Sequence, residues 1–305
     1  MKLDENNPRP ADSPEPGETA PEPDDASRAI HSASAEGGAT ALEAPGSPLR
    51  SVAEDLRVPW SWSDLLVFVL ACLAGAIFLV IVLAIATSVL GIRPSGTQKA
   101  LTESNIVGVV LQIVFDVCVI AYLAAQMRLR FGSPFWHTIG WRPFETGGVS
   151  RGMAYVGLVF AGFLLDVVVT LASAISPPKR TLPIETLFRD RRTALLFILM
   201  AVVVAPAVEE TIFRGYIYPV LARSWGIAAG VIVTGLLFGG LHAPQLWGGP
   251  WQIAALVFVG IVLTFARAST RTVVASFVIH TSYNSFQALA LLIGTHGLRH
   301  LPSIH

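Results

Sequence analysis

Seven long apolar runs follow residue 58 and constrain this chain more than any other feature. They cover approximately residues 65–90, 105–127, 152–175, 194–213, 226–242, 251–266 and 272–292. A helix of roughly 20 apolar residues crosses a hydrocarbon core of about 30 Å. With 53% hydrophobic and only 14% charged residues, the chain is predicted to be an all-α polytopic membrane protein. We expect a bundle of about seven to eight transmembrane helices, the eighth arising if residues 286–298 form a separate helix.

Residues 1–58 have a different composition. They hold 12 acidic and 5 basic residues, whereas the remaining chain holds 9 acidic and 16 basic residues. A segment rich in Pro, Glu, Asp and Ser buries too little apolar surface to offset the entropy of ordering. The sequence therefore predicts a disordered acidic cytoplasmic tail over 1–58, N-terminal transmembrane helices over 59–190, and a second helical part over 191–298.

The basic residues lie at the ends of the apolar runs and form no patch of the kind that binds nucleic acid.

Trp60 and Trp62 mark a membrane interface before the first run. The chain start lacks the features of a cleaved secretory signal. Lysines and arginines in the loops favour a cytoplasmic N-terminus. We expect a multi-pass protein of the cell membrane, with the lipid bilayer as its partner.

Glu209 and Glu210 are adjacent in the apolar run 194–213. Ionisable groups inside a membrane are costly, so their presence needs an explanation. Arg214 follows Glu210 at the i,i+4 spacing that places both on one helical face. Glu209 projects about 100° away and has Phe213 at its own i+4 position. The pattern predicts a Glu210–Arg214 pair and an unpaired Glu209 suited to proton transfer. Alternatively, both glutamates only hold helices together.

His242 is predicted to meet Glu209. The hairpin candidate between them is Arg223-Ser224-Trp225-Gly226, and each residue lies sixteen positions from that turn. At helical rise this distance is about 24 Å on either side, so antiparallel helices would bring the two residues to one depth.

His280 and Asn284 have i,i+4 spacing in the last run and offer two hydrogen-bond donors on one face. Polar side chains in spans also serve as contacts between helices without chemistry, and that alternative stays open for this pair. Asp116, with Gln112 one turn before it, and Asp166 lie in earlier runs. We interpret both aspartates as packing contacts, with a proton or ion path as the alternative.

The sequence has no His-Glu-x-x-His motif, no Gly-x-Ser-x-Gly motif and no Gly-x-Gly-Asp motif. A set of glutamate, histidines and asparagine remains. In this set Glu209 would accept a proton from water with the help of His242. His280 and Asn284 would stabilise the oxyanion of a hydrolysed peptide bond.

Three motifs occur in order, and with them the chain resembles the CPBP family, the type II CAAX prenyl proteases and abortive-infection proteins. They read Glu209-Glu210-x-x-x-Arg214, Phe238-x-x-x-His242 and His280-x-x-x-Asn284. The resemblance implies that residues 191–298 are the catalytic helices. It also implies that the chain is an intramembrane endopeptidase acting on a membrane-associated peptide or protein. It assigns catalysis to Glu209, His242, His280 and Asn284, with Glu210 and Arg214 in support.

Alternatives stay open for the cofactor of this reaction and for the function of the protein. The family carries a metalloprotease label, and Glu209, His242 and His280 can supply ligands to Zn²⁺. We favour a mechanism without a cofactor. A membrane scaffold or regulator on the same fold, or a small transporter that uses Asp116 and Asp166, are the other functions to weigh.

Overall fold

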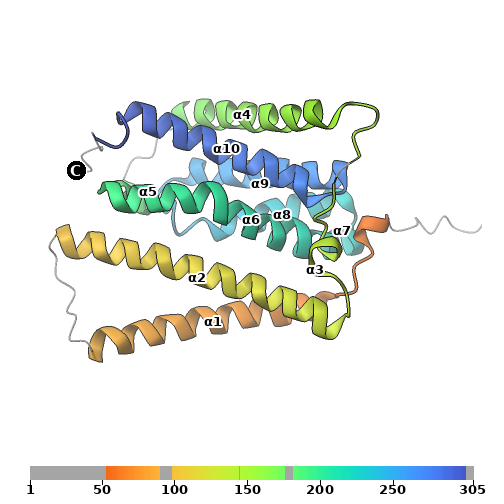
Figure 1. Ribbon diagram of the computed structural model, residues 1–305, viewed down its shortest axis with the longest axis horizontal. Coiled ribbons are helices and arrows are strands. Elements are labelled where there is room, and N and C mark those ends of the chain that lie inside the picture. The colour runs from red at the N-terminus through yellow and green to blue at the C-terminus, as the bar shows by residue number, and fades with distance from the viewer. Residues whose placement is uncertain (1–52, 90–97, 144, 176–180, 300–305) are drawn as a thin grey trace, which may run out of the picture. The chain divides into compact units, whose positions relative to one another are not determined.

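The computed structural model describes residues 53–89, 98–143, 145–175 and 181–299. Within these ranges the chain is helical and contains no strand. The helices outside residues 191–225 are η1 (Glu54–Leu56), α1 (Trp62–Val89), α2 (Gln98–Arg130), α3 (Phe135–Thr138), α4 (Arg151–Ile175), η2 (Pro183–Phe188), α8 (Ile227–Leu241), α9 (Pro250–Thr270) and α10 (Val273–Gly294) (Figure 1).

Residues 191–225 form one long rod built from α-helical and π-helical pieces. In chain order these are α5 (Arg191–Leu199), the π-helical η3 (Met200–Val204), α6 (Ala205–Glu209), the π-helical η4 (Glu210–Ile217) and α7 (Tyr218–Trp225).

Five helices of the described chain are long and apolar enough to cross a membrane, and the fold class is confirmed. They are Trp62–Val89, Asn105–Arg130, Arg151–Ile175, Arg191–Trp225 and Pro250–Thr270. The shorter helix α8 is apolar and has 15 residues. The protein is an all-α polytopic membrane protein, and each of the seven predicted runs coincides with a helix.

A proline follows closely after each π-helical segment of the rod. Pro206 is two residues beyond the end of η3, and Pro219 is two residues beyond the end of η4. A proline ring clashes with the carbonyl group four residues earlier and provides no N–H donor. A locally wider helix relieves that clash, and such segments are frequent at functional sites. Glu209 and Glu210 lie at the junction where α6 ends and η4 begins.

Helices α8 and α9 pack closely because glycines remove the side chains between them. A Cβ atom on Gly235 would lie 2.5 Å from Ile261 Cγ1, and one on Gly239 would lie 2.4 Å from Val257 Cγ2. Such distances are far below van der Waals contact. The close approach brings Gly260 of α9 against Gly235 and places the last turn of α8 beside the rest of the bundle.

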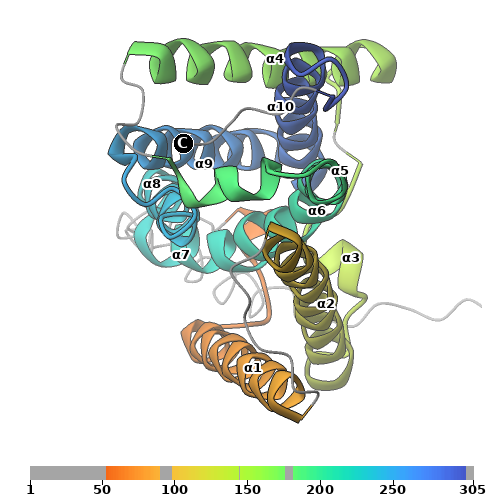
Figure 2. The ribbon, with the colours of Figure 1, turned by 90° about the vertical axis from the view of Figure 1, so that its left-hand side faces the viewer.

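Helix α10 packs against α4 and α9, and α2 packs against α5. Gly162 of α4 makes the α4 contact close, since a Cβ there would meet Ser282 Cβ at 2.6 Å. Figure 2 shows α4 beside α10 and α1 beside α2.

Two ends of the apolar runs are settled by the structure. The rod continues beyond the apolar run at 194–213 to Trp225, as the depth argument for Glu209 and His242 requires, because Glu210 and Arg214 neutralise each other inside the rod and do not interrupt it. Residues 286–298 form no separate helix, since α10 runs without a break to Gly294.

The end of the predicted tail is also ordered. Leu56 is 4% exposed, and Asp55 forms an ion pair with Arg267 at 2.8 Å. The Arg267 side chain is buried and needs a counter-charge, which explains why residues 53–58 pack against the bundle. Residues 1–52 of the predicted tail lie outside the described residues.

We predict that Gly235→Ala destabilises the protein by about 1–3 kcal/mol, the usual cost of overpacking a close contact. The measurement is the unfolding transition of the purified protein in detergent. Gly240→Ala is the matched control, because a Cβ at Gly240 meets nothing within 4 Å. Equal transitions for the two variants would contradict this account of the α8–α9 contact.

Candidate active site

A fully buried ion pair lies at the centre of the site. Glu210 Oε1 accepts a hydrogen bond from Arg214 at 2.9 Å, and both side chains are 0% exposed. The same oxygen lies 2.9 Å from His280 Nδ1 of α10. The predicted i,i+4 pair is therefore present, and a histidine 70 residues away completes it.

The guanidinium group of Arg214 also binds α9. Its Nε donates to Thr264 Oγ1 at 3.2 Å, and its NH2 group donates to the Gly260 carbonyl at 2.9 Å. It lies over the ring of Phe238 at 4.6 Å from the centroid, a cation–π arrangement. One side chain thus connects η4, α8 and α9.

Glu209 lies beside this buried pair and faces two histidines. Its Oε1 is 3.7 Å from His242 Nε2, and its Oε2 is 3.8 Å from His280 Nε2. The Glu209 side chain is 21% exposed. The structure brings together the glutamate and the histidine that the turn argument placed at one depth, and adds His280 on the other carboxylate oxygen.

The partners of the two histidines determine which ring nitrogens face Glu209. His242 Nδ1 is 2.8 Å from the Phe238 carbonyl oxygen, which only accepts hydrogen bonds. His280 Nδ1 is bound to the carboxylate of Glu210. Each Nδ1 therefore carries hydrogen and donates, so each neutral ring presents the lone pair of Nε2 to Glu209.

Asn284 does not join this cluster by a direct hydrogen bond. Its Nδ2 donates to the Ala201 carbonyl of η3 at 2.7 Å. Ala201 lies in a π-helical segment, where carbonyl groups lose their ordinary i+4 partners. The structure thus places three of the four predicted catalytic side chains together, and Asn284 on the same helix as His280 with one amide proton committed to the backbone.

The comparison with known proteins agrees with the three motifs. Residues 191–286 match the family model described as Type II CAAX prenyl endopeptidase Rce1-like. This segment is therefore similar to that family. The predicted resemblance is confirmed for these residues. No curated protein and no solved structure matches the chain.

The matched segment spans the rod, α8, α9 and most of α10. It contains all seven motif residues and ends two residues after Asn284. Asp116 and Asp166 lie outside it. Asp116 accepts a hydrogen bond from Gln112, one helical turn before it, at 2.8 Å. Asp166 lines a cavity of about 370 Å³ between α4 and α10.

Two contacts within the matched segment had no signal in the sequence. Thr264 and Gly260 bind Arg214, but a threonine and a glycine in an apolar run are ordinary residues of a transmembrane helix. Nor did the spacing of Glu210 and His280 indicate their hydrogen bond. Among the described residues, no three His, Cys, Asp or Glu side chains are grouped as metal ligands.

We predict that Glu210→Gln lowers the unfolding free energy by about 3–5 kcal/mol, because it leaves the buried Arg214 without its counter-charge. Glu209→Gln has the same chemistry one residue earlier. It should cost less than about 1 kcal/mol, since Glu209 is partly exposed. Unfolding of both variants in detergent measures the difference, and similar losses would show that the two glutamates are not distinguished by burial.

Proposed function

We propose that the chain is an intramembrane endopeptidase that hydrolyses a peptide bond of a membrane-associated peptide or protein. The observation that carries this proposal is the Glu209 carboxylate, which faces the Nε2 atoms of His242 and His280 at 3.7 and 3.8 Å. The match of residues 191–286 to a prenyl endopeptidase family gives the reaction class.

Activation of water is the first step. The Glu209–His242 separation is too long for a direct hydrogen bond and suits a bridging water molecule. The Glu209 carboxylate and His242 Nε2 both accept hydrogen bonds, and one water molecule can donate a hydrogen bond to each. Glu209 takes one proton as the water oxygen bonds to the scissile carbonyl carbon, while His242 orients the other.

Stabilisation of the oxyanion is the second role. The carbonyl π electrons move to oxygen when the C–O bond forms, and the resulting charge needs donors. His280 would supply one from Nε2 in its doubly protonated form, with its Nδ1 already bound to the Glu210 carboxylate. Asn284 supplies the second amide proton that Ala201 does not use.

Collapse of the tetrahedral intermediate completes the reaction. The carbonyl double bond re-forms, the C–N bond breaks, and the proton held by Glu209 passes to the leaving amine. The products are a carboxylic acid and an amine, with one water consumed. Glu210 and Arg214 take no part in bond changes and hold His280 in place.

We predict that Glu209→Gln lowers the cleavage rate by about 10²–10⁴-fold, the usual contribution of a general base. The assay uses proteoliposomes with a fluorogenic prenylated CAAX peptide and its unprenylated counterpart. Glu145→Gln is the control, because Glu145 is exposed and lies outside the Rce1-like segment. Equal cleavage by wild type and Glu209→Gln would overturn the mechanism. Absence of cleavage in both would favour the scaffold.

We further propose that hydrolysis needs no metal ion, so that Glu209, His242 and His280 act on water directly. Metal analysis of the purified protein, with cleavage assayed before and after chelation, tests this. We expect substoichiometric metal and an unchanged rate. Stoichiometric zinc whose removal abolishes cleavage would contradict it and assign these three residues as ligands.

A further inference from the structure

The cavity of about 370 Å³ between α4 and α10 opens on the lipid-facing side of these helices. It is lined by Asp166, Val167, Thr170, Leu171, Gln287 and Ala290. Four of these six residues are exposed, all except Asp166 and Val167. Because α4 is a candidate membrane span, its exposed side chains face the bilayer. Figure 2 shows α4 and α10 together at one edge of the bundle.

Asp166 lies deep within its span. It is fifteen residues from the start of α4 at Arg151 and nine residues from its end at Ile175. At helical rise these separations are about 22 and 13 Å. The hydrocarbon core of a bilayer is about 30 Å thick, so the carboxylate lies among lipid tails and not among headgroups. An ionisable group at this depth is costly and needs a partner.

The described part of the chain gives the Asp166 carboxylate only neutral partners. It interacts with the side chains of Gln287 and Thr170, and its Oδ1 atom is buried without a hydrogen-bond partner. None of the ion pairs between described residues includes Asp166. The contacts within these residues therefore leave the carboxylate short of a hydrogen bond and of a counter-charge.

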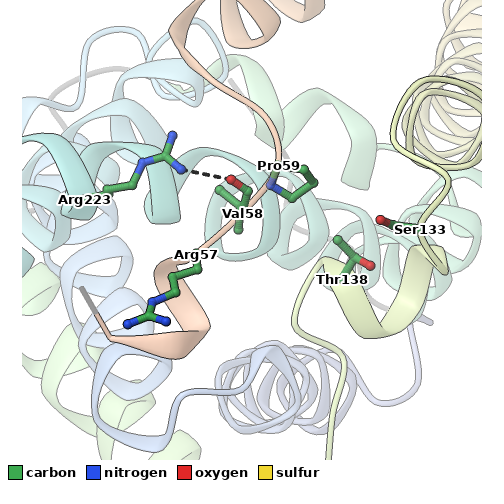
Figure 3. A pocket seen from close by; sticks show the side chains of 6 residues that line it. All are labelled: Arg57, Val58, Pro59, Ser133, Thr138 and Arg223. Carbon is green, nitrogen blue, oxygen red and sulfur yellow. Dashed lines mark hydrogen bonds between the residues drawn. The ribbon is translucent and has the colours of Figure 1, made fainter. Parts of the chain in front are cut away.

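The described helices of a second copy offer no basic group at this depth. The five candidate spans contain no lysine, and all their arginines except Arg214 lie within three residues of a span end. Arg223, at one such end, is bound to the carbonyl of Val58 at 2.9 Å (Figure 3). Arg214 is buried in its pair with Glu210, and α8 and α10 contain no arginine or lysine. The complementary charge has to come from a different protein.

We propose that this cavity binds a transmembrane helix of another membrane protein, and that this helix carries a lysine or arginine at the depth of Asp166. The basic group binds the Asp166 carboxylate, with Gln287 and Thr170 beside it. The cavity volume is roughly ten times the share of about 30 Å³ that one water molecule has in the liquid, so a long side chain fits. Gln287 is three residues beyond Asn284 on α10, and the bound helix therefore lies about one turn from the proposed catalytic residues.

The test reconstitutes the full chain in phosphatidylcholine vesicles with synthetic transmembrane peptides of leucine and alanine. The peptides carry lysine, glutamine or leucine nine residues from one end, and a fourth peptide carries lysine at its end. Energy transfer between labelled protein and labelled peptide measures binding, so the outcome does not depend on the reaction proposed above. We expect the inner lysine to strengthen binding at least about tenfold over leucine, the worth of a hydrogen bond to a charged group. The peptide with lysine at its end should bind like the leucine peptide.

Asp166→Asn should remove the preference for the inner lysine, because asparagine keeps the shape and hydrogen-bonding capacity of the side chain but not its charge. Asp116→Asn is the matched control. Asp116 is also an aspartate inside a candidate span, but it is bound to Gln112 and does not line the cavity, so this variant should keep the preference of the wild type. Thermal unfolding of both variants checks that each is folded.

Equal binding of the inner-lysine and leucine peptides by the wild type would overturn the proposal. A lysine preference that persists in Asp166→Asn would do the same. Equal binding of the glutamine and lysine peptides would contradict the role of charge and leave only hydrogen bonding. Energy transfer between two copies of the wild type that Asp166→Asn abolishes would identify a second copy as the occupant and also overturn the proposal.

Discussion

The buried pair of Glu210 and Arg214 is the interaction on which the rest of this structure depends. Two charges without solvent exposure need further hydrogen bonds to offset the loss of water. Arg214 makes such bonds to α9, and Glu210 Oε1 makes one to His280 of α10, while the buried Glu210 Oε2 has no hydrogen-bond partner. The rod and the last two helices are thereby held in one arrangement. Glu209, the next residue along the chain, is directed toward the two histidines as a consequence.

Helix shape and helix packing act together around this pair. The prolines that follow η3 and η4 coincide with wider turns at both ends of the glutamate pair, so the backbone there departs from a regular α-helix. Glycines at 235 and 239 allow α8 to approach α9, which carries Phe238 over Arg214 and His242 toward Glu209. In a bilayer, where apolar surface gives little preference for one helix partner over another, such close contacts and polar bonds decide the packing.

Residues 53–60, which precede α1, hold the first span against the bundle, although their composition predicted disorder for most of this segment. Trp60 is 1% exposed, stacks on Tyr216 and donates to the Tyr216 carbonyl at 2.9 Å. Asp55 neutralises Arg267, and Arg223 binds the carbonyls of Val58 and Trp60. These contacts hold the start of the first span against η4, α7 and α9.

The sequence by itself determined the fold class, because each apolar run long enough to cross a bilayer must form a helix there. It also determined the Glu210–Arg214 pair, since that bond joins residues one turn apart, and the common depth of Glu209 and His242, since both are counted from one turn. Only the tertiary structure decided that His280 binds Glu210, that Asn284 binds Ala201 and that residues 53–58 pack against α9. These contacts join residues 70 to more than 200 positions apart, and local periodicity carries no information on which helices become neighbours or how each is rotated.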